Sequence, residues 1–550
     1  MKTDHKTGFP IFEPKLESIF SRSDCYDILL ASNKTKQQNL GQFHTQNEII
    51  DVVLGSLPND YCERLLNGAS LIDPSCGTGN FLISVLKGVL ELLTRDLSEI
   101  EAFEQINSRV IPNIVGAEID PLLVTAANLN IRNAFAGQLT VPKIISIDSL
   151  DLETNEAFQR FGKKFDYVVG NPPWVEAKRL PDAVKDSVQL KYSVSNLYGA
   201  FLLQGARFLK PEGFLSFVVP RSFTGGRYYF KLRAFLANST SIRTISYFTN
   251  RNQEFQGGEV LQELVVICLQ NQTPTSEHIV QCKPCLDIDR FHDNVAFPVK
   301  QSSLFSKHDL IMLLAASTQE FKWMSKVASF KNFQQLGFGF STGQLVLHRS
   351  KDFLRAKPEP GTFRIIYGHD IFNEDGNYSF RRTVEAIKGR ESYAVCSGKK
   401  NLDGRKKHLS APSGVSSIES YCNRNREVIV CRRRSHKGDK RRFVGVYLSS
   451  ELPEGYFLEN GLNFIFQTPE HSLSAPPLAS VFRILRSDVF ERFMAIVSSN
   501  TQINKNDMYL FGIPESDGRT KKLYQKLELT DGNDLKVINE IVGKLYELPE

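Results

Sequence analysis

The chain contains 550 residues, of which 41% are hydrophobic and 23% charged, as in ordinary globular proteins with two or three domains. No apolar run approaches the roughly 18 residues that cross a bilayer. Residues 1–6 also lack the apolar segment of a signal peptide, so we expect a cytoplasmic protein without membrane contact. Residues 301–450 hold 27 Lys/Arg and 13 Asp/Glu, although the whole chain carries only +6. This placement indicates a polyanionic partner, with a merely soluble basic surface as the alternative.

The cysteines are nine in number and scattered, which fits a reducing compartment rather than a disulfide framework. Cys282 and Cys285 form a lone C-x-x-C pair with no second pair and no matching histidines nearby. A zinc site needs more ligands than this pair supplies. We therefore expect no metal.

The first half of the chain predicts alternating strands and helices. Residues 1–40 are polar and mixed, and we expect a short helical arm there. From residue 41, short apolar runs alternate with longer amphipathic segments, an order that predicts a doubly wound, mostly parallel sheet. The expected strands cover residues 70–73, 114–119, 143–147, 165–170 and 213–219, and the expected helices cover 81–93, a segment beginning at Pro121, and 196–209.

The second half is less regular. After about residue 272 the sequence becomes a mosaic of short β runs, Gly/Pro turns and basic clusters, with a helix expected over residues 535–545. We find no internal repeat. We therefore predict an N-terminal arm over residues 1–40, an α/β domain over 41–272 and a mixed α+β domain over 273–550.

A glycine loop follows the first expected strand, in the segment Asp73-Pro-Ser-Cys-Gly-Thr-Gly79. Gly77 and Gly79 let the backbone approach a ligand closely. The spacing differs from the G-x-G-x-x-G of dinucleotide sites. Open α/β sheets bind ligands at the carboxyl ends of their strands, where this loop lies. The loop therefore indicates a ligand other than a dinucleotide.

Three carboxylates follow three successive expected strands. Asp73 at the first strand end suits an ammonium group, such as that of a methionine moiety. Glu118 at the second suits a ribose diol, because a carboxylate accepts both hydroxyl protons. Asp148 at the third is placed to accept from an adenine amino group. Together with the glycine loop, these acids predict a nucleoside-containing ligand, although strand ends are also often simply polar.

A fourth expected strand ends in Asn171-Pro172-Pro173-Trp174. The exocyclic amine of adenine is a poor nucleophile, because its lone pair is delocalised into the ring. The Asn171 side-chain oxygen and the Pro172 carbonyl can accept from both of its N–H groups and draw the nitrogen toward tetrahedral geometry. Pro173 stiffens the turn, and Trp174 offers a flat face for stacking. A base inside a duplex must be flipped out to reach such a turn.

In these motifs the chain resembles the γ-class N6-adenine DNA methyltransferases of type II restriction-modification systems. The order of motifs is the same: the segment Phe43-His44-Thr45, the glycine loop, the Asn-Pro-Pro-aromatic turn and a separate C-terminal domain. The chain departs from the family pattern at Gln46, where proline is usual, and at Trp174, where Tyr or Phe is commoner. The resemblance runs from about residue 38 to about 515, with weaker matches at residues 260–263, 341–343, 432–442, 458–463, 500–502 and 512–514.

The resemblance implies an S-adenosylmethionine-dependent (class I, Rossmann-like) methyltransferase domain followed by a mixed α+β target-recognition domain. S-adenosylmethionine is the implied methyl donor and double-stranded DNA the implied partner. A second aromatic residue is expected to stack on the flipped base, with Phe255 the best match and Tyr247 and Phe248 as rivals. The residues implied to contact the cofactor are Thr45, Asp73, Ser75, Gly77, Glu118, Ile119, Asp148 and Asn171, and those implied to act at the target base are Asn171, Pro172, Pro173 and Trp174.

The densest basic cluster of the second half is expected to contact DNA phosphates or guanine edges. A solvated surface hairpin is the alternative. The members of this cluster are Arg432, Arg433, Arg434, Lys437, Lys440, Arg441 and Arg442.

Several other activities remain open from the sequence alone. An Asn-Pro-Pro-aromatic turn also serves protein-glutamine methyltransferases and RNA adenine or guanine methyltransferases. A restriction enzyme with a fused nuclease is less compatible, because only about 40 residues precede the methylase motifs. A non-catalytic DNA-binding protein is disfavoured by the complete motifs. We expect a prokaryotic monomer, and a separately encoded cognate endonuclease stays open as a counterpart.

Overall fold

The fold is given by a computed structural model of residues 1–550. The described residues are 2–3, 10–11, 45, 47–150, 164–176, 194–248, 264–285, 295–306, 310–343, 345–374, 377–381, 391–395, 397–400, 406–408, 427–434, 441–449, 455–497, 503 and 505–547.

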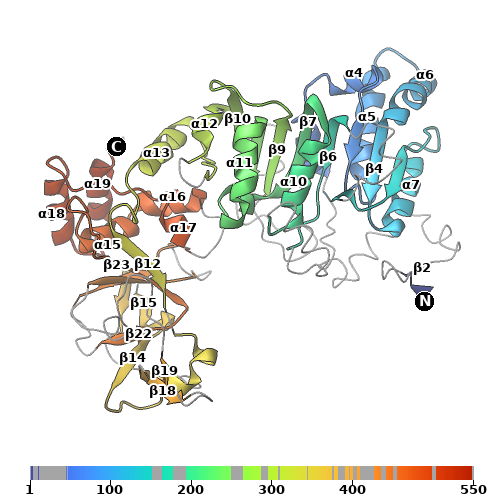
Figure 1. Ribbon diagram of the computed structural model, residues 1–550. Helices are drawn as coiled ribbons and strands as arrows, with labels where there is room; N and C mark the ends of the chain where they lie inside the picture. Colours follow the sequence, from blue (N-terminus) through green and yellow to red (C-terminus); the bar gives the residue numbers. More distant parts are fainter. Residues whose placement is uncertain are drawn as a thin grey trace. The chain divides into compact units, whose positions relative to one another are not determined.

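The chain divides into two compact units, Met1–Thr318 and Gln319–Glu550 (Figure 1). The first unit contains a nine-stranded sheet in the order β11-β10-β8-β9-β7-β6-β3-β4-β5. Strands β7, β6, β3, β4 and β5 run parallel, whereas β9 is antiparallel to both β7 and β8. The strands of this sheet are β3 (Leu71–Asp73), β4 (Ile114–Glu118), β5 (Lys143–Ser146), β6 (Phe165–Gly170), β7 (Leu209–Pro220), β8 (Ser241–Phe248), β9 (Leu264–Gln270), β10 (Ile279–Cys285) and β11 (Phe297–Lys300).

Helices cover both faces of the sheet. Ser216 of β7 donates a hydrogen bond to the Val53 carbonyl of α3 at 2.8 Å, whereas its neighbours Leu215 and Phe217 lie against Gly205 of α10. Successive strand residues point to opposite faces, so α3 and α10 lie on opposite sides of β7. In Figure 1, α10 and α11 lie side by side. The main helices of this unit are α3 (Asn47–Leu54), α4 (Tyr61–Leu66), α5 (Asn80–Leu93), α6 (Glu99–Gln105), α7 (Pro121–Ala134), α10 (Leu197–Arg207), α11 (Phe230–Ser239) and α12 (Gln301–Leu304).

The expected elements of the first half are present in the expected order, and the predicted doubly wound, mostly parallel sheet is confirmed. Helix α7 begins at Pro121, whose missing N–H costs nothing in a first turn, and Asp120 caps it by accepting from the Leu122 N–H. Two differences concern boundaries. The described residues of the expected N-terminal arm form a strand pair, β1 (Lys2–Thr3) with β2 (Pro10–Ile11). Strands β10 and β11 also continue the sheet beyond residue 272, which places the unit boundary after Thr318.

The described residues of the second unit form two four-stranded sheets, two separate strand pairs and a group of helices, as the α+β expectation requires. Its C-terminal helix, α19, covers the expected residues 535–545. One sheet has the order β12-β23-β20-β21 and the other β13-β17-β14-β22. The strands are β12 (Phe338–Thr342), β13 (Leu354–Arg355), β14 (Thr362–Ile366), β15 (Ile371–Glu374), β16 (Asn377–Phe380), β17 (Tyr393–Val395), β18 (Ser397–Lys400), β19 (Lys406–His408), β20 (Val428–Arg432), β21 (Gly445–Leu448), β22 (Tyr456–Leu458) and β23 (Leu462–Gln467), and the helices are α13 (Thr318–Ser329), α15 (Leu478–Arg486), α16 (Asp488–Val497), α17 (Lys505–Met508), α18 (Lys521–Leu529) and α19 (Leu535–Leu545).

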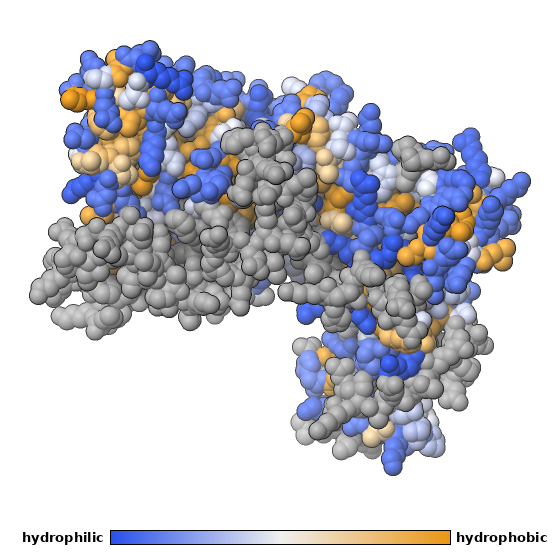
Figure 2. Space-filling model, turned by 180° about the vertical axis from the view of Figure 1, so that it is seen from behind, coloured by the Kyte–Doolittle hydropathy of each residue, from blue (hydrophilic) through white to orange (hydrophobic). Residues whose placement is uncertain are grey.

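Each unit buries a hydrophobic core of its own. In the first unit, apolar residues of α3 and α5 pack with those of β3, β6 and β9. In the second, the two small sheets share a cluster that includes Ile365, Val430 and Phe464. Hydrophilic residues predominate over the described part of the face shown in Figure 2. No helix among the described residues is long and apolar enough to cross a membrane.

Candidate functional site

The candidate site lies at the carboxyl edge of the parallel strands. The chain runs from β3 outward to β4 and β5 and then returns to place β6 on the other side of β3. The carboxyl ends of β3 and β6 therefore flank the point where the strand order reverses, which is where open α/β sheets bind ligands. Asp73 ends β3, Glu118 ends β4, and Asn171 follows β6 directly.

The glycine loop connects β3 to α5 and reaches across to β4. The Cys76 N–H donates to the Ala117 carbonyl at 3.0 Å, and Gly79 forms the N-cap of α5 with φ +89°. Gly77 has φ +53° and donates its N–H to Glu118 Oε2 at 3.1 Å. Both glycines occupy backbone conformations that other residues rarely adopt. The loop is thus held against the second strand by backbone groups and by the Glu118 carboxylate.

Glu118 is buried, and both of its oxygens accept from backbone N–H groups. Besides Gly77, the Asp120 N–H donates to Oε1 at 3.0 Å. Burial raises the pKa of Glu118, although these hydrogen bonds pull it in the opposite direction. Each carboxylate oxygen has a second lone pair that can accept from a ligand. Next to it, the Ile119 side chain is 48% exposed, unusual for a large apolar residue, and offers an apolar surface at the strand end.

Asp148 follows β5 and accepts from the Leu150 N–H at 2.9 Å through Oδ1. The neighbouring Ser149 hydroxyl donates to the Pro74 carbonyl in the glycine loop at 2.5 Å. The segment after β5 is therefore tied to the loop after β3. The three predicted acids lie at or just beyond the carboxyl ends of three adjacent strands.

Asp73 is fully buried at the centre of this edge. Its Oδ1 accepts from the Ser75 N–H at 3.0 Å, while its buried Oδ2 has no hydrogen-bond partner among the described residues. Desolvation raises the pKa of Asp73 to about 8, and the nearby Glu118 carboxylate adds to that shift. A buried carboxylate without a partner is costly, and a cationic group placed beside it would relieve that cost.

The Asn-Pro-Pro turn is held at Asn171 from two sides. The Asn171 Nδ2 donates to Thr45 Oγ1 at 3.0 Å, and its backbone carbonyl accepts from Ser75 Oγ at 3.3 Å. The Oδ1 atom of Asn171 is buried and has no hydrogen-bond partner in the described part of the chain. Pro172 is buried and Pro173 half-buried. The turn thus presents one unsatisfied acceptor at a fixed position.

The aromatic residues expected near the target base differ in their surroundings. Trp174 is half-buried and packs against the core of the first unit. Tyr247 is fully buried and donates its hydroxyl to the Ala315 carbonyl, so in this structure it is enclosed in the core. Phe255, Phe43 and Gln46 lie outside the described residues, as does the side chain of Phe248.

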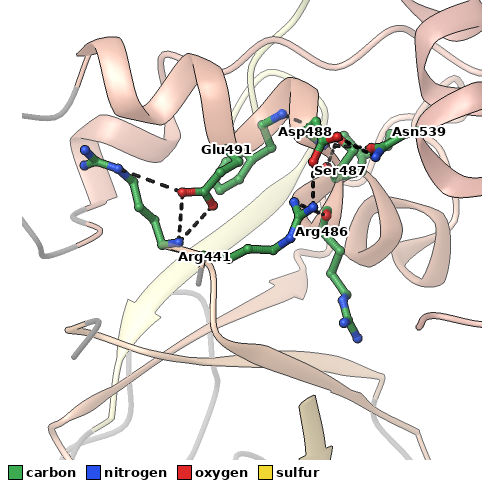
Figure 3. Close-up of polar contacts among 9 residues, drawn as sticks. Arg441, Arg486, Ser487, Asp488, Glu491 and Asn539 are labelled. Carbon is green, nitrogen blue, oxygen red and sulfur yellow. Dashed lines mark hydrogen bonds and ion pairs between the residues drawn. The ribbon is translucent and has the colours of Figure 1, made fainter. Parts of the chain in front are cut away.

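The structure divides the basic cluster into two groups. Arg432 donates from Nε to the Gly368 carbonyl at 2.9 Å and also to the Ile371 carbonyl. Arg441 bonds Asp488 Oδ1 at 2.6 Å and the Arg486 carbonyl at 2.9 Å (Figure 3). The Arg442 backbone N–H donates to both carboxylate oxygens of Glu491, and the Arg442 guanidinium forms an ion pair with Glu491 Oε1, with Nε at 4.0 Å.

Those three arginines therefore hold elements of the second unit together. Arg433 is half-buried, and its side chain makes no hydrogen bond or ion pair with another described residue; Arg434 is exposed. Lys437 and Lys440 lie outside the described residues. Within the described part of the cluster, Arg433 is therefore better placed for an external polyanion than Arg432, Arg441 or Arg442.

Two contributors to the site were missed by the sequence analysis. Gly170 has φ +150°, and a Cβ built on it would stand 2.6 Å from Asp73 Oδ1. Asp120 supports Glu118 through its backbone N–H while its own side chain caps α7. For Gly170, the available signal was a glycine directly before the Asn-Pro-Pro turn. For Asp120, the available signal was its place directly before Pro121, because Asp is favoured at the N-cap of a helix and Pro at its first position.

Comparisons with known proteins show which sequences and folds this chain is similar to. A family model described as "Eco57I restriction-modification methylase" matches residues 112–255. The chain is 24% identical over 498 residues to the type II methyltransferase M.BsuBI of Bacillus subtilis, covering 89% of each chain. It is 20% identical over 524 residues to the type II methyltransferase M.PstI of Providencia stuartii, covering 94% of each. These matches confirm the predicted resemblance to the methyltransferases of type II restriction-modification systems.

Solved structures share the fold along nearly the whole chain. The type IIL restriction-modification enzyme MmeI, determined in complex with DNA, superimposes with a TM-score of 0.59 at 14% identity and covers 99% of this chain and 83% of its own. The type ISP enzyme LlaGI, as a nuclease-deletion mutant with a DNA substrate mimic, gives 0.52 at 13% identity and covers 95% and 50%. The predicted fold class, an α/β unit with a mostly parallel sheet and a mixed α+β C-terminal unit, is confirmed.

Proposed function

Because the chain is similar to type II DNA methyltransferases along most of its length, we propose that it is a site-specific DNA methyltransferase acting on the N6 amine of adenine. The observation that carries this proposal is the buried Oδ1 of Asn171, which has no hydrogen-bond partner among the described residues and is followed in the chain by the Pro172 carbonyl. An exocyclic amine supplies two donors, and two fixed acceptors are the complement it needs.

The site residues fit S-adenosylmethionine, which supplies an activated methyl group on a sulfonium. Asp73 Oδ2 is a buried carboxylate oxygen without a described partner, at a position suited to the ammonium of the methionine moiety. Glu118 would accept from the ribose hydroxyls, Ile119 would pack on the adenine, and Asp148 would accept from its amino group. Thr45, Ser75 and Gly77 would line the same pocket.

The chemistry of the Asn-Pro-Pro turn follows from the two acceptors. As Asn171 Oδ1 and the Pro172 carbonyl accept from the amine, its nitrogen regains lone-pair density for attack on the methyl carbon. The new N–C bond would replace the bond between the methyl carbon and the sulfonium sulfur, leaving S-adenosylhomocysteine, and one N–H proton would pass from the methylated nitrogen to solvent. Preorganised acceptors stabilise the positive charge that develops on that nitrogen during transfer. Trp174, with Phe255 in support, would stack on the adenine once it has left the duplex.

DNA binding is assigned to the second unit. Its basic composition supports the assignment, as does the presence of DNA in the MmeI and LlaGI structures. Arg433 and Arg434, with Lys437 and Lys440, are proposed to contact DNA. A monomer suffices because one flipped base needs one active site, and a separately encoded endonuclease is the proposed counterpart in a restriction-modification pair.

A transfer assay distinguishes this function from methylation of RNA or protein. Purified protein would be given tritium-labelled S-adenosylmethionine with duplex DNA, RNA or an unfractionated protein extract, and labelled DNA would be digested to nucleosides. We expect label in DNA alone, where it should be recovered as N6-methyldeoxyadenosine. We expect no label with Asn171→Ala. Label in RNA or protein but not in DNA would overturn the assignment of the acceptor.

A further inference from the structure

The hydrogen bond between Thr45 and Asn171 joins two segments that are 126 residues apart in the chain. Thr45 is 8% exposed and lies two residues before α3. Helix α3 is fixed to the sheet, because Ile49, Ile50 and Val53 are fully buried and the Val53 carbonyl accepts from Ser216 of β7. The Thr45 hydroxyl is therefore held at a defined place relative to the strands that carry the site.

In the structure, this contact goes with one orientation of the Asn171 amide. An amide is planar, with two donors on Nδ2 and an acceptor at Oδ1. With Nδ2 bonded to Thr45 Oγ1, Oδ1 points away from Thr45, and it is this atom that lacks a described partner. A half-turn of the amide would bring Oδ1 to the Thr45 hydroxyl, which can also donate, and would present N–H donors to the N–H donors of a target amine.

The backbone of Asn171 is restrained separately. Ser75 Oγ donates to the Asn171 carbonyl, so the glycine loop fixes the main chain while Thr45 fixes the side chain. Only the second restraint bears on the orientation of the amide. The two restraints therefore have different consequences when each is removed.

We propose that Thr45 is a positioning residue for catalysis, which orients the Asn171 amide so that Oδ1 faces the acceptor amine. This inference rests on the proposed methyl transfer. It assigns Thr45 a role beyond lining the cofactor pocket, and the role does not require Thr45 to touch the cofactor or the base.

The test compares Thr45→Val with Thr45→Ser. Valine keeps the branched shape but removes the hydroxyl, and serine keeps the hydroxyl. Single-turnover methyl transfer would be measured at saturating DNA and cofactor, and the Kd of S-adenosylhomocysteine by calorimetry. We expect Thr45→Val to slow transfer by about 10- to 100-fold, the range for loss of one preorganised polar contact. Any loss of S-adenosylhomocysteine affinity should be smaller than the loss of rate, and Thr45→Ser should restore most of the rate.

A matched control removes a hydroxyl elsewhere. Thr94 lies at the end of α5 and donates to the Leu90 carbonyl at 2.9 Å, so Thr94→Val loses one exposed hydrogen bond. It should transfer methyl groups at the wild-type rate. A weaker Kd with an unchanged single-turnover rate in Thr45→Val would mean that Thr45 serves the cofactor and would overturn the proposal. Equal loss of rate in Thr45→Val and Thr45→Ser would reduce its role to packing.

Failure of the proposed function would look different. If the wild-type protein methylates another acceptor, the same comparison is made with that acceptor, because Thr45 would orient the Asn171 amide toward any amine that Asn171 holds. If Asn171→Ala transfers methyl groups as fast as the wild type, the proposed function fails, whatever the Thr45 variants do.

Discussion

Asp73 and Gly170 are in contact across the neighbouring strands β3 and β6, where a Cβ on Gly170 would lie 2.6 Å from Asp73 Oδ1. Asp73 belongs to the proposed cofactor site, and Gly170 immediately precedes Asn171 of the proposed base site. The absence of a side chain at one residue is therefore what lets the two sites share one sheet edge.

Gly170→Ala should damage both functions of that edge. The new methyl group would displace the Asp73 carboxylate, and φ +150° is strained for alanine. We expect cofactor affinity to fall at least about 10-fold and unfolding free energy to fall by about 1–3 kcal/mol. Calorimetric titration would measure the cofactor affinity, and thermal unfolding would measure the change in stability. Gly137→Ala is the control, since Gly137 also has positive φ, +75°, but open space at its Cβ. It should lose stability and keep its cofactor affinity.

Asp73 should make the cofactor-free protein less stable as pH rises. Its pKa is about 8 in the folded chain against an ordinary 3.8, so the folded state binds a proton that the unfolded state releases. That contribution is complete below pH 4 and is lost as pH approaches and passes 8. Asp73→Asn stays neutral throughout. Between pH 5 and 8, the stability of the variant relative to wild type should rise by on the order of 1–3 kcal/mol.

Thermal unfolding of both proteins across this pH range checks the prediction. A difference between them that does not change with pH would show that Asp73 is ionised in the folded protein from pH 5 upward.

Ile119 should contribute to cofactor binding and little to folding, because 48% of its surface is exposed at the strand end. Ile119→Ala should weaken S-adenosylmethionine binding by about 3- to 10-fold, the effect of losing about 1 kcal/mol of apolar contact. Ile100 of α6, 72% exposed, provides the comparison. Ile100→Ala should bind the cofactor like the wild type, and an equal loss in both variants would contradict the assignment of Ile119.

The basic cluster should separate into residues for stability and residues for DNA. Arg441→Gln breaks the bonds to Asp488 and the Arg486 carbonyl and should lower stability by about 1 kcal/mol, a modest amount because Asp488 is exposed. Arg433→Gln should leave unfolding unchanged and weaken DNA binding. Phosphate contacts release counterions from DNA. A plot of log DNA affinity against log salt concentration should therefore have a slope shallower by about one for Arg433→Gln than for the wild type. Unchanged DNA affinity and salt slope in Arg433→Gln would remove Arg433 from the interface.

The sequence predicted the parallel core well, because its evidence is local. Buried strands, a proline at the first position of α7 and glycines at the turn after β3 each have a specific backbone consequence. Strand ends in turn predict which side chains share an edge, so Asp73, Glu118 and Asn171 could be grouped from the amino-acid sequence alone.

Contacts between distant segments could not be predicted in that way. The pairing of β10 with β8 depends on tertiary packing, so the extension of the sheet past residue 272 was missed. The arginines of the basic cluster look alike in sequence. Only their neighbours in space, such as Asp488 and Glu491, reveal that Arg441 and Arg442 are used within the protein. The Thr45–Asn171 hydrogen bond also joins two segments that are distant in the chain, so the sequence alone could not predict it.

Modification-sensitive long-read sequencing of DNA from a methylase-free host tests the central claim most directly. Wild-type protein and Asn171→Ala would be expressed in parallel. The account predicts N6-methyladenine at one defined sequence motif with the wild type and at no motif with the variant. A folded wild-type protein that binds S-adenosylmethionine yet leaves no methylated motif, or a motif carrying methylcytosine, would contradict it.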